Sequence, residues 1–173
     1  NNKPRFIRRS RGYVPEPIHC DGLEQTSILA MGSDLKNAFA VNKGSEVLVG
    51  PHIGDLENAS THKTLEWTIE RYKSLFSIQP EKIIIDSHPQ FFSSRLGERI
   101  GESFHLSVIP VQHHHAHIAS VMAEHNLRGL VLGIAMDGTG YGPDGTIWGG
   151  EFLLCKGNQY QRLAHIHAAP LPG

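Results

Sequence analysis

LSVIPVQ (106–112), HHHAHIASVMAEHNL (113–127) and GLVLGIAMDG (129–138) follow one another in the chain and predict a strand, a helix and a second strand. The first run is apolar and β-branched, which is typical of a strand buried in a parallel sheet. The helix is expected to stop at Arg128-Gly129. This alternation indicates an α/β unit whose ligand site lies at the carboxyl ends of its strands.

The chain before this segment fits the same fold class. Three short apolar runs in 27–50 predict a meander of strands with glycine turns. Residues 57–78 predict an amphipathic helix that Pro80 closes. KIIIDSH (82–88) predicts a buried parallel strand, and FFSSRLGERIGESF (91–104) predicts a second helix.

After residue 138 the strand pattern begins again, with TIWGGEFLL (146–154) and YQRLAHI (160–166). SILAMGSDLKNAFAV (27–41) and VLGIAMDGTGYGPDGTIWGG (131–150) both combine an apolar strand, a Gly/Asp turn and a second strand. We therefore expect one α/β lobe and the opening hairpin of a second, similar lobe. The alternative is a single three-layer domain with two incidental hairpins.

The composition indicates a globular protein without a strong charge field. There are 16 Lys and Arg against 17 Asp and Glu, a formal net charge of -1. We expect no membrane and no nucleic-acid partner, although KPRFIRRSRGY (3–13) is locally basic. Cys20 and Cys155 form no CxxC pair, which fits a reducing compartment and predicts a cytoplasmic protein. The start without methionine and the turn-forming end APLPG (169–173) predict a piece of a longer protein.

Four histidines crowd the start of the third helix, at His113, His114, His115 and His117. His113 and His117 are four residues apart, share a helix face and can reach one cation. Asp137 ends the next strand and is the expected third ligand; two imidazoles and a carboxylate suit zinc, iron or manganese. His114 and His115 project elsewhere and are expected to support or pack, although His114 with His117 is an open alternative. A surface tract or buried structural histidines are the other readings.

DGTGYGPDGTIWGGE (137–151) is rich in glycine but matches neither a Walker A loop nor a Rossmann fingerprint. It predicts a β-hairpin whose backbone amides approach a phosphate. Asp137 or Asp144 is expected to hold a metal that bridges phosphate oxygens. A tight structural hairpin is the alternative. The candidate phosphate contacts are Gly138, Thr139 and Gly140.

Further candidates lie in turns and at strand ends. Lys36 occupies the equivalent turn of the first lobe, GSDLKN (32–37), where it touches a phosphate or is merely exposed. Helix capping by Ser87 is the competing account for the polar residues that follow strand 82–88. The weaker binding candidates are His52, Asp55, Asp86, His88, Ser93 and Arg95.

Six blocks in order resemble the HypF family, the carbamoyltransferases of NiFe-hydrogenase maturation. The blocks are RRSRGYVPEP (8–17), GSDLKNAFAV (32–41), HIGDLEN (52–58), DSHPQFFSSRLGE (86–98), VQHHHAHIASVMAEH (111–125) and DGTGYGPDGTIWGGE (137–151). The resemblance implies an ASKHA fold, actin- and Hsp70-like, with RNase H-like lobes. It implies the tail of a YrdC-like domain and a linker over 1–22, the first lobe over 23–128, and the start of the second over 129–173.

The resemblance also implies a function. A YrdC-like domain makes carbamoyl-adenylate from ATP and carbamoyl phosphate, and the lobed domain passes the carbamoyl group to the C-terminal cysteine of HypE. That thiocarboxamide becomes the source of the cyanide ligands on iron. The family's metal histidines map to His113 and His117 and its aspartate to Asp137, which would also make these the catalytic residues. The expected cofactors are ATP and a divalent metal, zinc, iron or magnesium.

The departures from the family are omissions. The acylphosphatase-like domain, the CxxC zinc fingers, most of the YrdC-like domain and the remainder of the second lobe are not in this sequence. We therefore expect an incomplete site and no full turnover from this chain alone. The alternative functions are an ASKHA-type phosphotransferase, a tRNA threonylcarbamoyl-transfer relative and a metal-storing module.

Overall fold

The computed structural model describes residues 15–23 and 25–168, which form two compact units. One unit contains residues up to 85 together with 90–109, and the other contains 86–89 and the residues from 110 onward. The predicted YrdC-like tail falls largely on residues 1–14, outside the described residues. The predicted domain boundaries at residues 22 and 128 stay predictions.

The first unit is built around a six-stranded sheet in the order β1-β4-β3-β2-β5-β6. Its first four strands pair antiparallel, and β2 pairs parallel with β5, so the predicted meander followed by a parallel strand is confirmed. Gly44, at φ +59, makes the tight turn between β3 and β4. The strands are β1 (Ile18–His19), β2 (Ile28–Ala30), β3 (Ala40–Lys43), β4 (Glu46–Val49), β5 (Lys82–Asp86) and β6 (Ser107–Val111).

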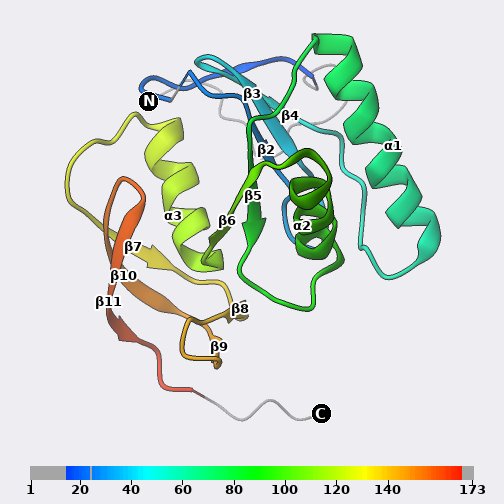
Figure 1. The fold of residues 1–173 in the computed structure, drawn as a ribbon. Helices are drawn as coiled ribbons and strands as arrows, with labels where there is room; N and C mark the ends of the chain where they lie inside the picture. Colours follow the sequence, from blue (N-terminus) through cyan, green and yellow to red (C-terminus); the bar gives the residue numbers. More distant parts are fainter. Residues whose placement is uncertain (1–14, 24, 169–173) are drawn as a thin grey trace, which may run out of the picture. The chain divides into compact units, whose positions relative to one another are not determined.

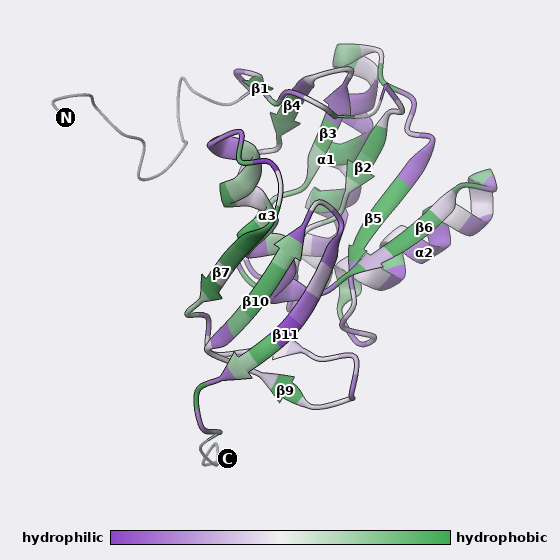
Figure 2. Cartoon of the chain, turned by 90° about the vertical axis from the view of Figure 1, so that its left-hand side faces the viewer, coloured by the Kyte–Doolittle hydropathy of each residue, from purple (hydrophilic) through white to green (hydrophobic). Residues whose placement is uncertain are grey.

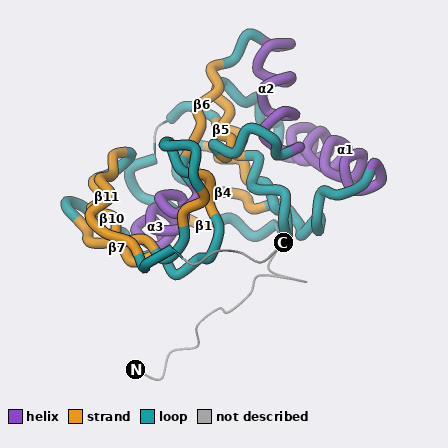
Figure 3. Tube along the Cα trace, turned by 90° about the horizontal axis from the view of Figure 1, so that it is seen from below, coloured by secondary structure: helices purple, strands orange, loops and turns teal. Residues whose placement is uncertain are grey.

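Helices α1 (Ala59–Phe76) and α2 (Phe92–Phe104) lie next to each other in the first unit (Figures 1 and 3). The side chain of Asn58 caps α1, since it accepts the backbone N–H groups of Ser60 and Thr61. The two helices pack on one face of the sheet, because their buried side chains join those of the strands in one core. This core includes Leu29, Met31, Phe39, Val41, Leu65, Ile69, Ile83 and Leu96.

The prediction that 106–112 is a buried strand is wrong. Strand β6 is the edge of the sheet, with a strand neighbour on one side only. Ile109 is 41% exposed, and Ser107 and Pro110 are exposed as well. An apolar, β-branched run therefore specified a strand here but not its burial, which depends on what packs beside it.

The second unit packs α3 (His113–Glu124) against a three-stranded antiparallel sheet in the order β11-β10-β7 (Figure 1). Ile118 and Met122 of α3 are buried with Ala135, Leu153 and Cys155 of the strands. The predicted hairpin is present as the pair β8–β9. The strand predicted over 146–154 divides at Gly149–Gly150 into β9 and β10. The strands are β7 (Val131–Ala135), β8 (Gly140–Tyr141), β9 (Ile147–Trp148), β10 (Glu151–Lys156) and β11 (Gln159–His165).

Strand β7 is hydrophobic along its length, including residues that reach the surface (Figure 2). Leu132 and Ile134 alternate with the buried Gly133 and Ala135 and are 58% and 55% exposed. None of the helices in the described part of the chain combines the length and the apolar character that a membrane span requires.

Gly133 allows α3 to approach β7 closely, because a Cβ there would collide with the side chain of Ile118. We expect Gly133→Ala to lower the free energy of unfolding by about 1–3 kcal/mol through overpacking, measured by urea denaturation. Adding Ile118→Ala removes the obstructing side chain. The double variant should then lose less than the sum of the two single losses. Strict additivity would show that the two residues do not collide.

Candidate metal centre

Three side chains of the second unit converge on one point. His113 Nε2 lies 2.9 Å from Asp137 Oδ2, and His117 Nε2 lies 3.4 Å from the same oxygen. The two Nε2 atoms are 3.2 Å apart. This triangle is small enough for a single ion to bond all three atoms at about 2.0–2.2 Å. The donor set, two imidazoles and one carboxylate, fits a divalent metal.

The local structure of α3 explains why two of these ligands meet. Gln112 is the N-cap residue, and its side chain accepts the backbone N–H of His115 at 2.9 Å, so the helix begins at His113. His113 and His117 then lie one turn apart on one face. Gln112 was not singled out in the sequence, although its position directly before the helix was the available signal.

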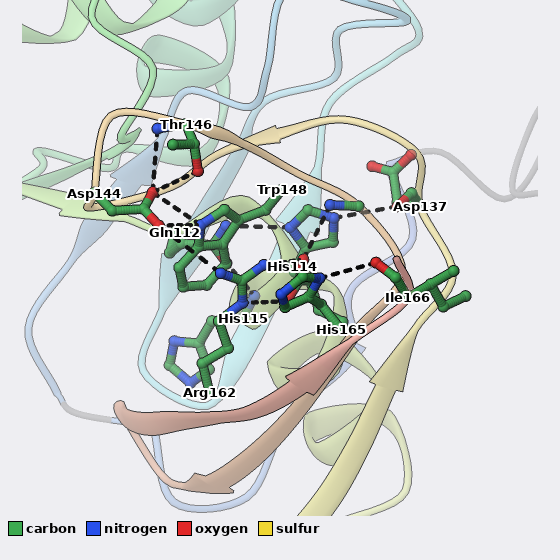
Figure 4. Close-up of polar contacts among 12 residues, drawn as sticks. Gln112, His114, His115, Asp137, Asp144, Thr146, Trp148, Arg162, His165 and Ile166 are labelled. Atoms are coloured by element: carbon green, nitrogen blue, oxygen red, sulfur yellow. Dashed lines mark hydrogen bonds and ion pairs between the residues drawn. The ribbon is translucent and has the colours of Figure 1, made fainter. Parts of the chain in front are cut away.

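The side chain of His114 contacts both Gln112 and Asp137 (Figure 4). The Gln112 side-chain amide donates to His114 Nδ1 at 3.2 Å, so the proton of the imidazole sits on Nε2 and is donated to the Asp137 carbonyl at 3.3 Å. The ring is fully buried, and this burial lowers the pKa of His114, which keeps it neutral. A Cβ on Gly140 would collide with the same ring, so the turn after Asp137 packs directly on it.

The Asp137 backbone is held from a second direction. Its carbonyl also accepts the N–H of Gly150 at 2.9 Å, at the point where the hairpin returns to β10. His114 and Gly150 together therefore fix the backbone that carries the third ligand. Of the predicted phosphate contacts, Gly138 and Thr139 are exposed at this turn and Gly140 is buried.

The electrostatics of the group centre on His113. A hydrogen bond to Asp86 raises the pKa of His113, and the negative charges of Asp86 and Asp137 add to the effect, while burial opposes it. Burial alone would raise the pKa of Asp137, but the charges of His113 and His117 and the N–H of Gly138 lower it. The two neighbouring carboxylates therefore favour the protonated form of His113, and a metal that binds Nε2 would have to displace a proton.

Asp144 is committed to the hairpin and does not join the ligand group. It accepts the Thr146 hydroxyl at 2.8 Å, the Thr146 N–H at 3.1 Å and the Trp148 indole N–H at 3.0 Å (Figure 4). The hydrogen bonds from Thr146 lower the pKa of Asp144. The structure therefore favours Asp137 over Asp144 as the metal ligand.

A second polar network braces the base of this hairpin, and sequence reasoning missed it. Glu151 is fully buried and accepts Arg162 through two bonds of 2.6 and 2.8 Å and the Gly149 N–H at 3.0 Å. The Arg162 guanidinium lies 4.0 Å from the centre of the Trp148 ring. A charged residue at a strand start carries no periodic signal, so only the fold reveals these partners.

The remaining candidates lie mostly in the first unit. The Lys36 side chain is exposed, and its backbone N–H donates to Asp55 at 2.6 Å, so Asp55 holds that turn. Ser87 does not cap α2. Instead Asp34 accepts the N–H groups of Phe92 and Ser93 at 2.7 and 2.9 Å. These residues and Arg95 are not among the ligand residues of the second unit. Contact of Lys36 with a phosphate stays a prediction.

Comparison with known proteins agrees with the family resemblance that the six sequence blocks indicate. Residues 23–124 match the HypF Kae1-like domain, and residues 133–173 match the second subdomain of the Kae1-like domain of carbamoyltransferases. The chain belongs to the HypF family. The expected resemblance is thus confirmed, together with a Kae1-like, ASKHA-related α/β fold. Its description as RNase H-like lobes stays a prediction.

The relatives are enzymes of the same name. The chain is 46% identical over 172 residues to the carbamoyltransferase HypF of Synechocystis sp. (strain ATCC 27184 / PCC 6803 / Kazusa), covering 99% of this chain and 22% of that protein. It is 43% identical over 169 residues to the carbamoyltransferase HypF of Rhizobium leguminosarum bv. viciae, covering 98% and 22%. The chain therefore spans less than a quarter of the length of these relatives.

Solved structures of the family share the fold. A crystal structure of full-length HypF in the phosphate- and nucleotide-bound form matches with a TM-score of 0.87 and 48% identity, over 94% of this chain and 25% of that one. The crystal structure of T. kodakarensis HypF matches with a TM-score of 0.88 and 40% identity, over 100% and 23%.

Metal affinity should depend on pH through His113. Because its pKa is raised above 6.5, the fraction with a neutral Nε2 falls as the pH drops through that raised value. We expect isothermal titration with zinc to give weaker binding at pH 6 than at pH 8, with proton release that grows as the pH falls. His113→Ala, His117→Ala and Asp137→Ala should each weaken binding. Wild-type affinity in all three variants would place the metal elsewhere.

Proposed function

We propose that this chain supplies part of the transfer site of an ATP-dependent carbamoyltransferase. The observation that carries the proposal is the ligand triangle of His113, His117 and Asp137 beside a glycine-rich turn, in a chain of the HypF family. The named relatives are carbamoyltransferases, and one solved relative is described as phosphate- and nucleotide-bound. This combination supports a site for phosphate-bearing carbamoyl donors.

The proposed reaction joins two steps. In the first, water cleaves the bond between the carbamoyl group and the phosphate of carbamoyl phosphate, which gives carbamate and phosphate; a carbamate oxygen then attacks the α-phosphorus of ATP, the bond to pyrophosphate breaks, and carbamoyl-adenylate forms. The thiolate of a C-terminal cysteine of HypE then attacks the carbamoyl carbon, a C–S bond forms, and the C–O bond to AMP breaks, so that AMP leaves. The thiol proton goes to solvent or to a base.

Residues of this chain bind and orient the donor in this proposal. His113, His117 and Asp137 would hold a divalent metal, which is zinc, iron or magnesium. Its positive charge would offset the negative charge on phosphate or carbamoyl oxygens. The exposed amides of Gly138 and Thr139 would approach the phosphates, with the Thr139 hydroxyl as a further donor. Lys36 is the proposed cationic contact to a phosphate.

A chimera tests the proposal. The matching segment of the Synechocystis relative is replaced by this chain, and pyrophosphate release from ATP is measured with and without carbamoyl phosphate. We expect release that requires carbamoyl phosphate, and carbamoylation of the HypE C-terminal cysteine, followed by mass spectrometry. His117→Ala should keep the release and lose at least 100-fold in the rate of delivery to HypE, roughly the effect of one lost electrostatic contact.

The unmodified relative is the activity control, and Glu124→Gln, an exposed change on the same helix, is the control variant. Cleavage of ATP to ADP, or pyrophosphate release that does not depend on carbamoyl phosphate, would contradict the proposal and favour a phosphotransferase. Unimpaired delivery by a folded His117→Ala chimera would remove the metal centre from the transfer step.

A further inference from the structure

Asp86, the last residue of β5, lies behind the imidazole of His113. Its Oδ2 is 2.8 Å from His113 Nδ1, whereas the other ring nitrogen, Nε2, is 2.9 Å from Asp137 Oδ2. The Asp86 Oδ1 accepts the backbone N–H of His88 at 2.9 Å. The ring of His113 therefore stands between Asp86 and the ligand group, and both oxygens of Asp86 have defined partners.

Burial and chemistry give this contact a direction. The Asp86 side chain is 7% exposed and that of His113 is 19% exposed, so water competes little for the hydrogen bond. An ionised carboxylate accepts hydrogen bonds and donates none. Nδ1 therefore carries a proton in both forms of the ring, and once the second proton leaves, the lone pair of Nε2 faces His117 and Asp137. Histidines that ligate metals commonly pass their other N–H to such a partner.

We propose that Asp86 is a positioning residue for the metal centre, which fixes His113 as the Nδ1–H tautomer and holds its ring so that Nε2 completes the ligand triangle. This inference rests on the proposed function, because it needs the metal centre to exist. Asp86 would contact neither the metal nor the substrate. It would act through His113, and its hydrogen bond to this ring joins residue 86 to the start of α3.

Cobalt binding by the 173-residue chain tests the role, with affinity and the visible absorption of bound Co²⁺ as readouts. We expect Asp86→Ala to bind Co²⁺ about 10–100-fold more weakly and to change the intensity of the absorption bands. Asp86→Asn keeps an oxygen that accepts the Nδ1 proton and should recover most of the affinity. The control Glu124→Gln removes an exposed carboxylate from α3, the helix that carries His113, and should bind Co²⁺ as the wild type does.

The tautomer provides an independent readout. In long-range ¹H–¹⁵N spectra of the cobalt-free, zinc-loaded chain, His113 should carry its proton on Nδ1. If Asp86→Ala does not fold, this wild-type spectrum decides: a proton on Nδ1 supports the role, and zinc bound through Nδ1 overturns it. An Asp86→Ala chain with wild-type affinity and spectrum overturns the role and leaves the metal centre standing. A wild-type chain that binds neither ion overturns the metal centre and the role together.

Discussion

The imidazole of His113 is the point on which the described site depends. One ring nitrogen lies 2.8 Å from Asp86 and the other lies 2.9 Å from Asp137, so within the second unit a single side chain connects Asp86, the start of α3 and the turn after β7. Two carboxylates around one imidazole stabilise its charged form when no metal is bound. The same arrangement would offer a ligand group to a metal once the proton leaves.

The packing of the second unit keeps this arrangement in place. Gly133 lets α3 lie close to the sheet, and the Gln112 side chain fixes where the helix begins. The buried His114 then links the helix to the Asp137 carbonyl. Each of these contacts positions backbone that carries a ligand, so the precision of the site comes from neutral, buried groups around it.

The sequence predicted the grouping of the three candidate ligands better than it predicted their surroundings. The four-residue spacing of His113 and His117 and the place of Asp137 at a strand end are local features, and the structure brings all three together. The contacts of Gln112 and Glu151 depend on tertiary packing, which no period in the sequence encodes. Asp144 resembles Asp137 in its glycine-rich context, yet its carboxylate accepts hydrogen bonds from Thr146 and Trp148.

The same limit applies to the prediction of the fold from the sequence. Element types followed from apolar spacing and from turn residues, whereas the exposure of β6 follows from its edge position in the sheet. The capping of α2 by Asp34 joins residues almost 60 positions apart, as the 58-residue separation of Asp34 and Phe92 shows. Such pairs have no local signature that would separate them from ordinary turn residues.

X-ray absorption spectroscopy of the zinc-loaded chain tests the central claim most directly, because it reports the atoms around the ion. The account predicts scattering from two imidazoles at about 2.0–2.1 Å and from a carboxylate oxygen at about 2.0–2.2 Å. The imidazole signal should halve when His117 is replaced by alanine. Zinc surrounded by oxygen alone, or two imidazoles that persist in His117→Ala, would contradict it.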